Sequence, residues 1–137
     1  MRKLIINKSL NSPEVHFDPD NKRFEITGES RPSNVYAFYD ELIRWVDEYS
    51  VYLSDLNGRE DKVEFNLDLN YFNSSSARYI LDFCKKVAAL HSKCGNVKVR
   101  WHYEADDVDI LEAGREMSRM AKIPFEYVEK GFDDKPE

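Results

Sequence analysis

Three consecutive serines, Ser74, Ser75 and Ser76, follow Asn73 at a point where the sequence pattern changes. Before them, residues 63–70 alternate between apolar and polar types, which predicts a strand with one buried face. After them, apolar residues recur at helical spacing. The first turn of a helix carries unpaired N–H groups and the positive end of the helix dipole, so it accommodates a phosphate well. The hydroxyls are therefore either plain helix caps or acceptors of a phosphoryl group.

Other residue types capable of chemistry do not form recognisable motifs. The serines lack the Gly-x-Ser-x-Gly pattern of hydrolases, and no histidine is placed by the sequence as their base. The five glycines are scattered and form no phosphate-binding loop. His16, His91 and His102 have no metal-ligand spacing, either among themselves or with Cys84 and Cys94. We therefore expect neither a metal site nor a bound cofactor.

An acidic run is the only sequence feature that favours an enzyme. Glu104, Asp106, Asp107 and Asp109 offer oxygen ligands for a divalent cation, so a small metal-dependent enzyme using the three aspartates is one alternative. Capping of a helix that begins at Asp106 or Asp107, together with a solvated acidic end, explains the same residues. Capping is the interpretation that we favour.

Composition limits the class of protein further. The 137 residues are 42% hydrophobic, which suffices for one core, and we expect a single domain over residues 1–129 with a polar tail over 130–137. The net charge of −6 comes from mixed acidic and basic residues, which argues against a nucleic-acid surface. No apolar run reaches membrane-spanning length, no secretory leader is evident and the two cysteines are not paired in a CxxC motif. These features predict a cytoplasmic protein.

Hydrophobic periodicity predicts an α/β fold: a single layered domain with a mixed sheet, an N-terminal hairpin and three helices joined to strands by parallel crossovers. The expected strands cover residues 4–6, 14–18, 23–27, 63–70, 97–103 and 125–128, with a turn over 19–22 and a polar loop over 56–61. The expected helices run from about 34 to 52, from 74 to 91, and from 107 to the stop at Pro124. Ser33 is the expected N-cap of the first helix, and Asn73 or Ser74 that of the second.

Two further patterns concern surfaces. Trp101 and Tyr103 share a strand face that should be buried, so Arg100 and His102 should project from the opposite face. In a sheet covered on one side only, that face is open to a partner. In the third helix the apolar stripe is Val108, Leu111, Met117, Met120 and Ala121. In the first helix, Tyr36 lies at the edge of the apolar stripe and is the aromatic residue most suited to an exposed position.

The strand, Asn-Ser-Ser and helix arrangement resembles the phosphorylatable loop of STAS-type anti-anti-sigma factors. Longer segments are similar to the SiaC family of bacterial regulatory phosphoproteins. These segments occur in the same order along the chain as in the family, and together they span roughly residues 4–128. They are residues 28–39 followed by Trp45, residues 71–76, residues 99–103, and Pro124 with Phe125.

This resemblance implies a STAS-like, non-enzymatic switch protein. Family members are phosphorylated by a kinase with a histidine-kinase-like ATPase fold and dephosphorylated by a PPM-type phosphatase. The unphosphorylated form binds and activates a diguanylate cyclase, which raises cyclic di-GMP and promotes biofilm formation. The rival is a STAS-like adaptor that is never phosphorylated and acts in another partner-switching pathway.

The resemblance also assigns residues. The family acceptor directly follows the Asn, which makes it Ser74 here, where the family pattern has Thr. Ser75 is the alternative acceptor, and Asn73 shapes the loop. Ser74, Ser75 and Arg78, which lies one helical turn after Ser74, are the expected partner-binding residues.

Overall fold

The computed structural model describes residues 1–56 and 62–131. The strands are β1 (Leu4–Ile6), β2 (Glu14–Asp18), β3 (Arg23–Ser30), β4 (Val63–Phe72), β5 (Val97–Glu104) and β6 (Phe125–Lys130). The helices are α1 (Val35–Asp55), α2 (Ser74–Cys94) and α3 (Val108–Ala121). Within the described ranges this order is the predicted one, so the expected α/β fold class is confirmed.

One mixed sheet contains all six of these strands, in the order of the chain from β1 to β6. β1, β2 and β3 pair antiparallel, and the turn between β2 and β3 closes with a bond from the Lys22 N–H to the Pro19 carbonyl, 3.2 Å. β3, β4, β5 and β6 pair parallel, with one helix between each successive pair. The predicted hairpin and parallel crossovers are therefore both confirmed.

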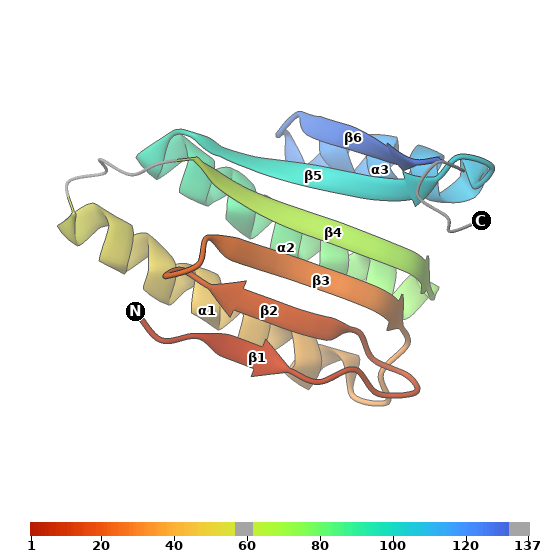
Figure 1. Ribbon diagram of the computed structural model, residues 1–137, viewed down its shortest axis with the longest axis horizontal. Coiled ribbons are helices and arrows are strands. Elements are labelled where there is room, and N and C mark those ends of the chain that lie inside the picture. The colour runs from red at the N-terminus through yellow and green to blue at the C-terminus, as the bar shows by residue number, and fades with distance from the viewer. Residues whose placement is uncertain (57–61, 132–137) are drawn as a thin grey trace.

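All three helices lie on one face of the sheet (Figure 1). The strands consequently alternate: Phe65 and Leu67 of β4 are 1% exposed beneath the helices, whereas Asn66 and Asp68 are half-buried on the other face. A sheet covered on one side needs this period-two pattern, while a sheet covered on both sides would need continuous apolar strands. Because the helices cover one side only, the strands could be predicted from the alternation of apolar and polar residues.

β3 extends three residues beyond its predicted end at residue 27. β3 continues to Ser30 because Gly28 takes a positive φ of 123°, and the pairing with β4 shifts register between Gly28 and Glu29.

The predicted N-cap of α1 was wrong. Asn34, not Ser33, caps α1, since its side-chain oxygen accepts the Ala37 N–H at 3.0 Å.

Several elements are longer than periodicity indicated. α1 reaches Asp55, α2 reaches Cys94, and the last strand includes Lys130. The predicted polar loop, apart from Leu56, and the tail beyond residue 131 lie outside the described residues. None of the described helices combines the length and apolar character needed to cross a membrane.

The predicted apolar stripe of α3 was partly wrong. Met117 and Ala121 are buried, but Val108 is 64% exposed and Met120 45% exposed. α3 packs over β5 and β6 at one edge of the sheet, so its contact with the core is narrow (Figure 1). Gly114 allows α3 to approach β5 closely, because a Cβ there would meet the indole of Trp101.

Candidate functional site

The turn between β4 and α2 is held by three hydrogen bonds around Asn73. Its side-chain oxygen accepts the Ser76 N–H at 2.8 Å, and its carbonyl accepts the Ala77 N–H at 2.9 Å. Its own N–H donates to the Ser30 carbonyl at the end of β3, 3.2 Å away. Asn73 is therefore the N-cap of α2, and Ser74 is the first helical residue.

The three serines of this turn have different environments. Ser74 and Ser75 are exposed, whereas Ser76 is 0% exposed and its hydroxyl lies 3.0 Å from that of Ser30. A modifying enzyme can reach the first two hydroxyls but not the third without unfolding the turn. The first turn of α2 contains no acidic residue, so its positive dipole end is not neutralised by a local carboxylate.

Arg78 supplies positive charge next to these serines. It is exposed on α2 four residues after Ser74, and no ion pair joins it to any residue within 1–56 or 62–131. Its guanidinium is thus available to a partner carboxylate or to a phosphate on the preceding turn.

An apolar groove of about 430 Å³ runs between α2 and α3 beside Arg78. It is lined by Phe72, Ala77, Arg78, Leu81, Ala113, Glu116, Met117 and Met120. On the other side of α2, Tyr36 of α1 is 58% exposed and its ring centroid lies 6.3 Å from that of Tyr79. This agrees with the edge position predicted for Tyr36. The start of α2 therefore lies between two apolar surfaces, the α2–α3 groove and the Tyr36–Tyr79 pair. Residue spacing alone did not predict that these surfaces are neighbours.

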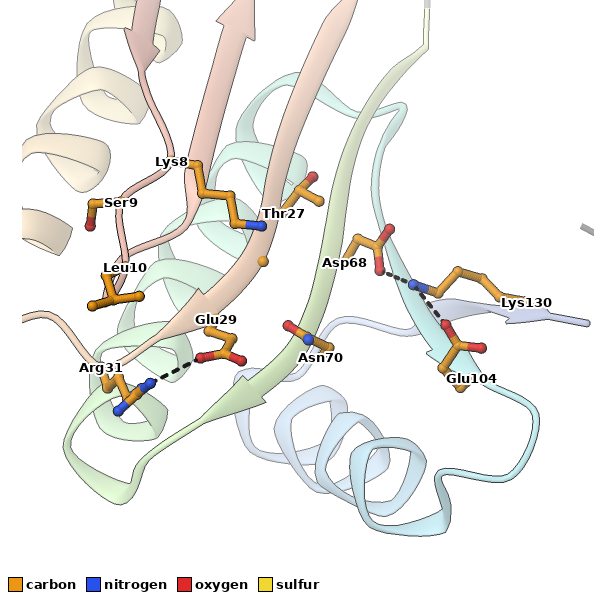
Figure 2. A pocket seen from close by; sticks show the side chains of 11 residues that line it. Lys8, Ser9, Leu10, Thr27, Glu29, Arg31, Asp68, Asn70, Glu104 and Lys130 are labelled. Atoms are coloured by element: carbon orange, nitrogen blue, oxygen red, sulfur yellow. Dashed lines mark hydrogen bonds and ion pairs between the residues drawn. The ribbon is translucent and has the colours of Figure 1, made fainter. Parts of the chain in front are cut away.

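The open face of the sheet carries a polar crevice of about 490 Å³ at the carboxyl ends of β3, β4 and β5 (Figure 2). The Lys130 Nζ lies 2.6 Å from Asp68 Oδ1 and 3.6 Å from Glu104 Oε2. Glu29 pairs with Arg31 at 3.4 Å. These charges largely satisfy one another, and the crevice opens on the face opposite the helices. It therefore lies across the sheet from α2, and its lining reaches Asn70, three residues before Asn73.

Arg100 and His102 project onto this open face, as predicted. Arg100 Nε donates to Glu126 Oε1 at 2.8 Å, and His102 Nε2 lies 2.8 Å from Asn66 Oδ1. Burial lowers the pKa of His102 below its ordinary value, which favours the neutral imidazole. Trp101, on the other face, is buried as expected, whereas Tyr103 is only half-buried.

Residues considered for other chemistry have structural explanations in the cap of α3 and in the core. Asp107 caps α3, because its Oδ1 accepts the Ile110 N–H at 3.1 Å, which confirms the capping interpretation. Over residues 1–56 and 62–131, no three His, Cys, Asp or Glu side chains gather as a metal-binding group. Cys84 is fully buried, and burial raises the pKa of its thiol to about 12, so it is unreactive at neutral pH.

The fold and the turn together define a class of protein: a small mixed α/β domain with exposed hydroxyls at a helix start that follows a parallel strand. Residues 6–130 match the model of the SiaC family of regulatory phosphoproteins. The chain belongs to that family.

The chain is also similar to one relative in sequence and to solved structures in fold. An uncharacterised protein of Pseudomonas aeruginosa (strain UCBPP-PA14) is 26% identical over 125 residues, which cover 91% of this chain and 94% of the relative. SiaC of P. aeruginosa has a similar fold, with a TM-score of 0.74, 24% identity, and coverage of 96% of this chain and 99% of that one. A structure of the diguanylate cyclase SiaD with its activator SiaC matches with a TM-score of 0.76, 23% identity, and coverage of 93% and 98%.

The exposure of Ser74 yields a stability prediction. We expect the free energy of unfolding of Ser74→Asp to lie within about 1 kcal/mol of the wild-type value, because a carboxylate suits the first turn of a helix. Ser76→Asp, two residues later, is the matched control and should lose several kcal/mol, since it buries a charge. Chemical denaturation of both variants measures this contrast, and a large loss in Ser74→Asp would mean that Ser74 is structural.

Proposed function

We propose that this protein is a cytoplasmic, non-enzymatic switch that is reversibly phosphorylated on Ser74 and that binds and activates a diguanylate cyclase when unphosphorylated. The carrying observation is the exposed Ser74 hydroxyl at the start of α2 in a member of a family of regulatory phosphoproteins. The solved complex of a related fold with a diguanylate cyclase supports the choice of partner. Regulation of cyclic di-GMP and biofilm formation follows from that partner.

The proposed modifying enzymes are a kinase with a histidine-kinase-like ATPase fold and a PPM-type phosphatase. Both enzymes require a hydroxyl that is accessible without unfolding of the protein. Ser74 and Ser75 meet this requirement, and Ser76 does not. Ser74 is the preferred acceptor because it directly follows Asn73, the position that the family resemblance assigns. Ser75, which is also exposed, is the alternative.

The switch acts at an interface rather than through unfolding. A phosphoryl group on Ser74 adds roughly −1.5 to −2 charge at neutral pH, and the dipole of α2 tolerates that charge. The same charge must lose its water when a partner packs against the turn, and a buried unpaired charge costs several kcal/mol. A penalty of about 3 kcal/mol weakens binding by more than a hundredfold.

Arg78 gives the switch a second component. In the unmodified protein its guanidinium has no ion-pair partner among the described residues and is available to an acidic group on the cyclase. After phosphorylation, the guanidinium turns to the phosphate one helical turn away and forms a charge-assisted bond. One contact with the cyclase is then withdrawn while the new negative charge repels the partner.

The acceptor assignment is tested by incubating the protein with ATP and the histidine-kinase-like kinase encoded in the same genome, then mapping the modified residue by mass spectrometry. We expect one phosphate on Ser74, no phosphate on Ser74→Ala, and wild-type incorporation on Ser75→Ala. Modification confined to Ser75 would move the site by one residue. An unmodified protein, both in this reaction and by intact mass after purification from its host, would favour a plain adaptor.

A further inference from the structure

Three buried hydroxyls lie directly behind the serine turn and come from three different elements. Ser30 ends β3, Tyr39 lies in the second turn of α1, and Ser76 is the third residue of α2. All three residues are 0% exposed. The Ser30 Oγ lies 2.6 Å from the Tyr39 hydroxyl and 3.0 Å from Ser76 Oγ.

The directions of these bonds form a chain. Ser30 donates its hydroxyl proton to Ser76, so the Tyr39 hydroxyl must be the donor to Ser30. Burial raises the pKa of Tyr39 above its ordinary value, which keeps this donor protonated throughout the physiological range. No buried side-chain N or O atom among the described residues lacks a partner, so each of the three hydroxyls has at least one hydrogen bond.

Ser30 is the centre of the cluster and also reaches the turn through its backbone. Its carbonyl accepts the Asn73 N–H at 3.2 Å, and the side chain of Asn73 in turn accepts the Ser76 N–H at 2.8 Å. The register shift at Gly28 gives β4 one extra residue, Asn70, and pairs Ser30 with Phe72, immediately before Asn73. The bulge therefore sets Ser30 at the level where α2 begins.

We propose that Ser30, Tyr39 and Ser76 are the positioning residues of the phosphoacceptor turn: their buried hydroxyl chain ties the start of α2 to β3 and α1, and so holds Ser74 and Ser75 at the surface. Because the chain ends on Ser76, the helical turn cannot rotate Ser76 outward or Ser74 inward without breaking it. This inference deepens the proposed function and rests on it for the identity of the acceptor.

The test compares Tyr39→Phe, which removes one hydroxyl and keeps the ring, with Ser118→Ala. Ser118 is a matched control for Ser30, because its hydroxyl likewise makes two hydrogen bonds, to the Ile123 carbonyl at 2.7 Å and from the Phe125 N–H at 3.2 Å. It lies at the C-terminal end of α3, far along the strands from Asn73. Ser30→Ala serves as the second variant.

Amide hydrogen exchange of the protein alone is the first measurement. In Tyr39→Phe and Ser30→Ala, the Asn73, Ser76 and Ala77 amides should exchange at least tenfold faster than in wild type, relative to central β4 amides that report global unfolding. Ser118→Ala should leave these three amides unchanged on the same scale. Equal acceleration of turn and β4 amides, or no acceleration, would overturn the proposal whether or not the protein is ever phosphorylated.

Phosphorylation kinetics are the second measurement, under conditions in which every variant is folded. The kcat/KM for phosphoryl transfer from ATP by the histidine-kinase-like kinase should fall at least tenfold in Tyr39→Phe and remain at the wild-type value in Ser118→Ala. Wild-type kinetics in Tyr39→Phe would overturn the positioning role. A wild-type protein that accepts no phosphate would instead refute the proposed function, and the exchange experiment would still decide the role of the hydroxyls.

Discussion

Phosphorylation of Ser74 is expected to weaken the binding of the diguanylate cyclase by more than a hundredfold. The phosphate would lie on the first residue of α2, one helical turn before Arg78 of the α2–α3 groove, so a partner that covers this region must desolvate it. Isothermal titration of the cyclase with unmodified and phosphorylated protein measures the difference. Ser74→Ala should bind like the unmodified form, and Ser74→Asp should bind poorly.

The same titration separates the contributions of the neighbouring residues. Arg78→Ala should weaken binding of the unmodified protein, because it removes the cation offered to the cyclase. Arg115→Ala is a suitable control, since Arg115 is an exposed arginine already paired with Glu112 on α3. Equal affinities for phosphorylated and unmodified protein would refute the switch, and wild-type affinity in Arg78→Ala would remove Arg78 from it.

Gly114→Ala is expected to destabilise the fold by about 3 kcal/mol, although alanine is the better helix former. A Cβ at this position would lie 2.5 Å from Nε1 of Trp101 and 2.6 Å from its Cδ1. The indole cannot move aside easily, because Nε1 donates to the Ile110 carbonyl at 2.9 Å and the ring stacks on Phe125. The melting temperature should fall by roughly 10 °C.

The control for this prediction is the double variant Gly114→Ala with Trp101→Phe, in which a smaller ring leaves room for the methyl group. Trp101→Phe alone should be destabilising. In that background, however, Gly114→Ala should lower the free energy of unfolding by less than it does in the wild-type protein. A Gly114→Ala protein more stable than wild type would show that helix propensity outweighs the contact with Trp101.

Much of the fold was predictable because its sheet is covered on one side only. Alternation in β4 and the turn at Pro19 follow from local rules, and they correctly indicated a hairpin followed by strand–helix units. Errors occurred where a contact or a backbone angle outside the local pattern decided the outcome. β3 continues through Gly28 to Ser30, past its predicted end at residue 27, and Val108 is exposed because α3 lies at the sheet edge.

The sequence by itself determined the serine turn: an amide residue, three hydroxyls and a helix pattern after a strand are local features, and they identified Asn73 as a candidate cap. Only the tertiary structure decided which hydroxyls are accessible. Ser76 is buried because Ser30 and Tyr39, 46 and 37 positions earlier in the chain, come together behind it through the bulge in the sheet and the packing of α1 against α2. Burial depends on contacts between distant segments, and residue spacing within one segment carries no information about them.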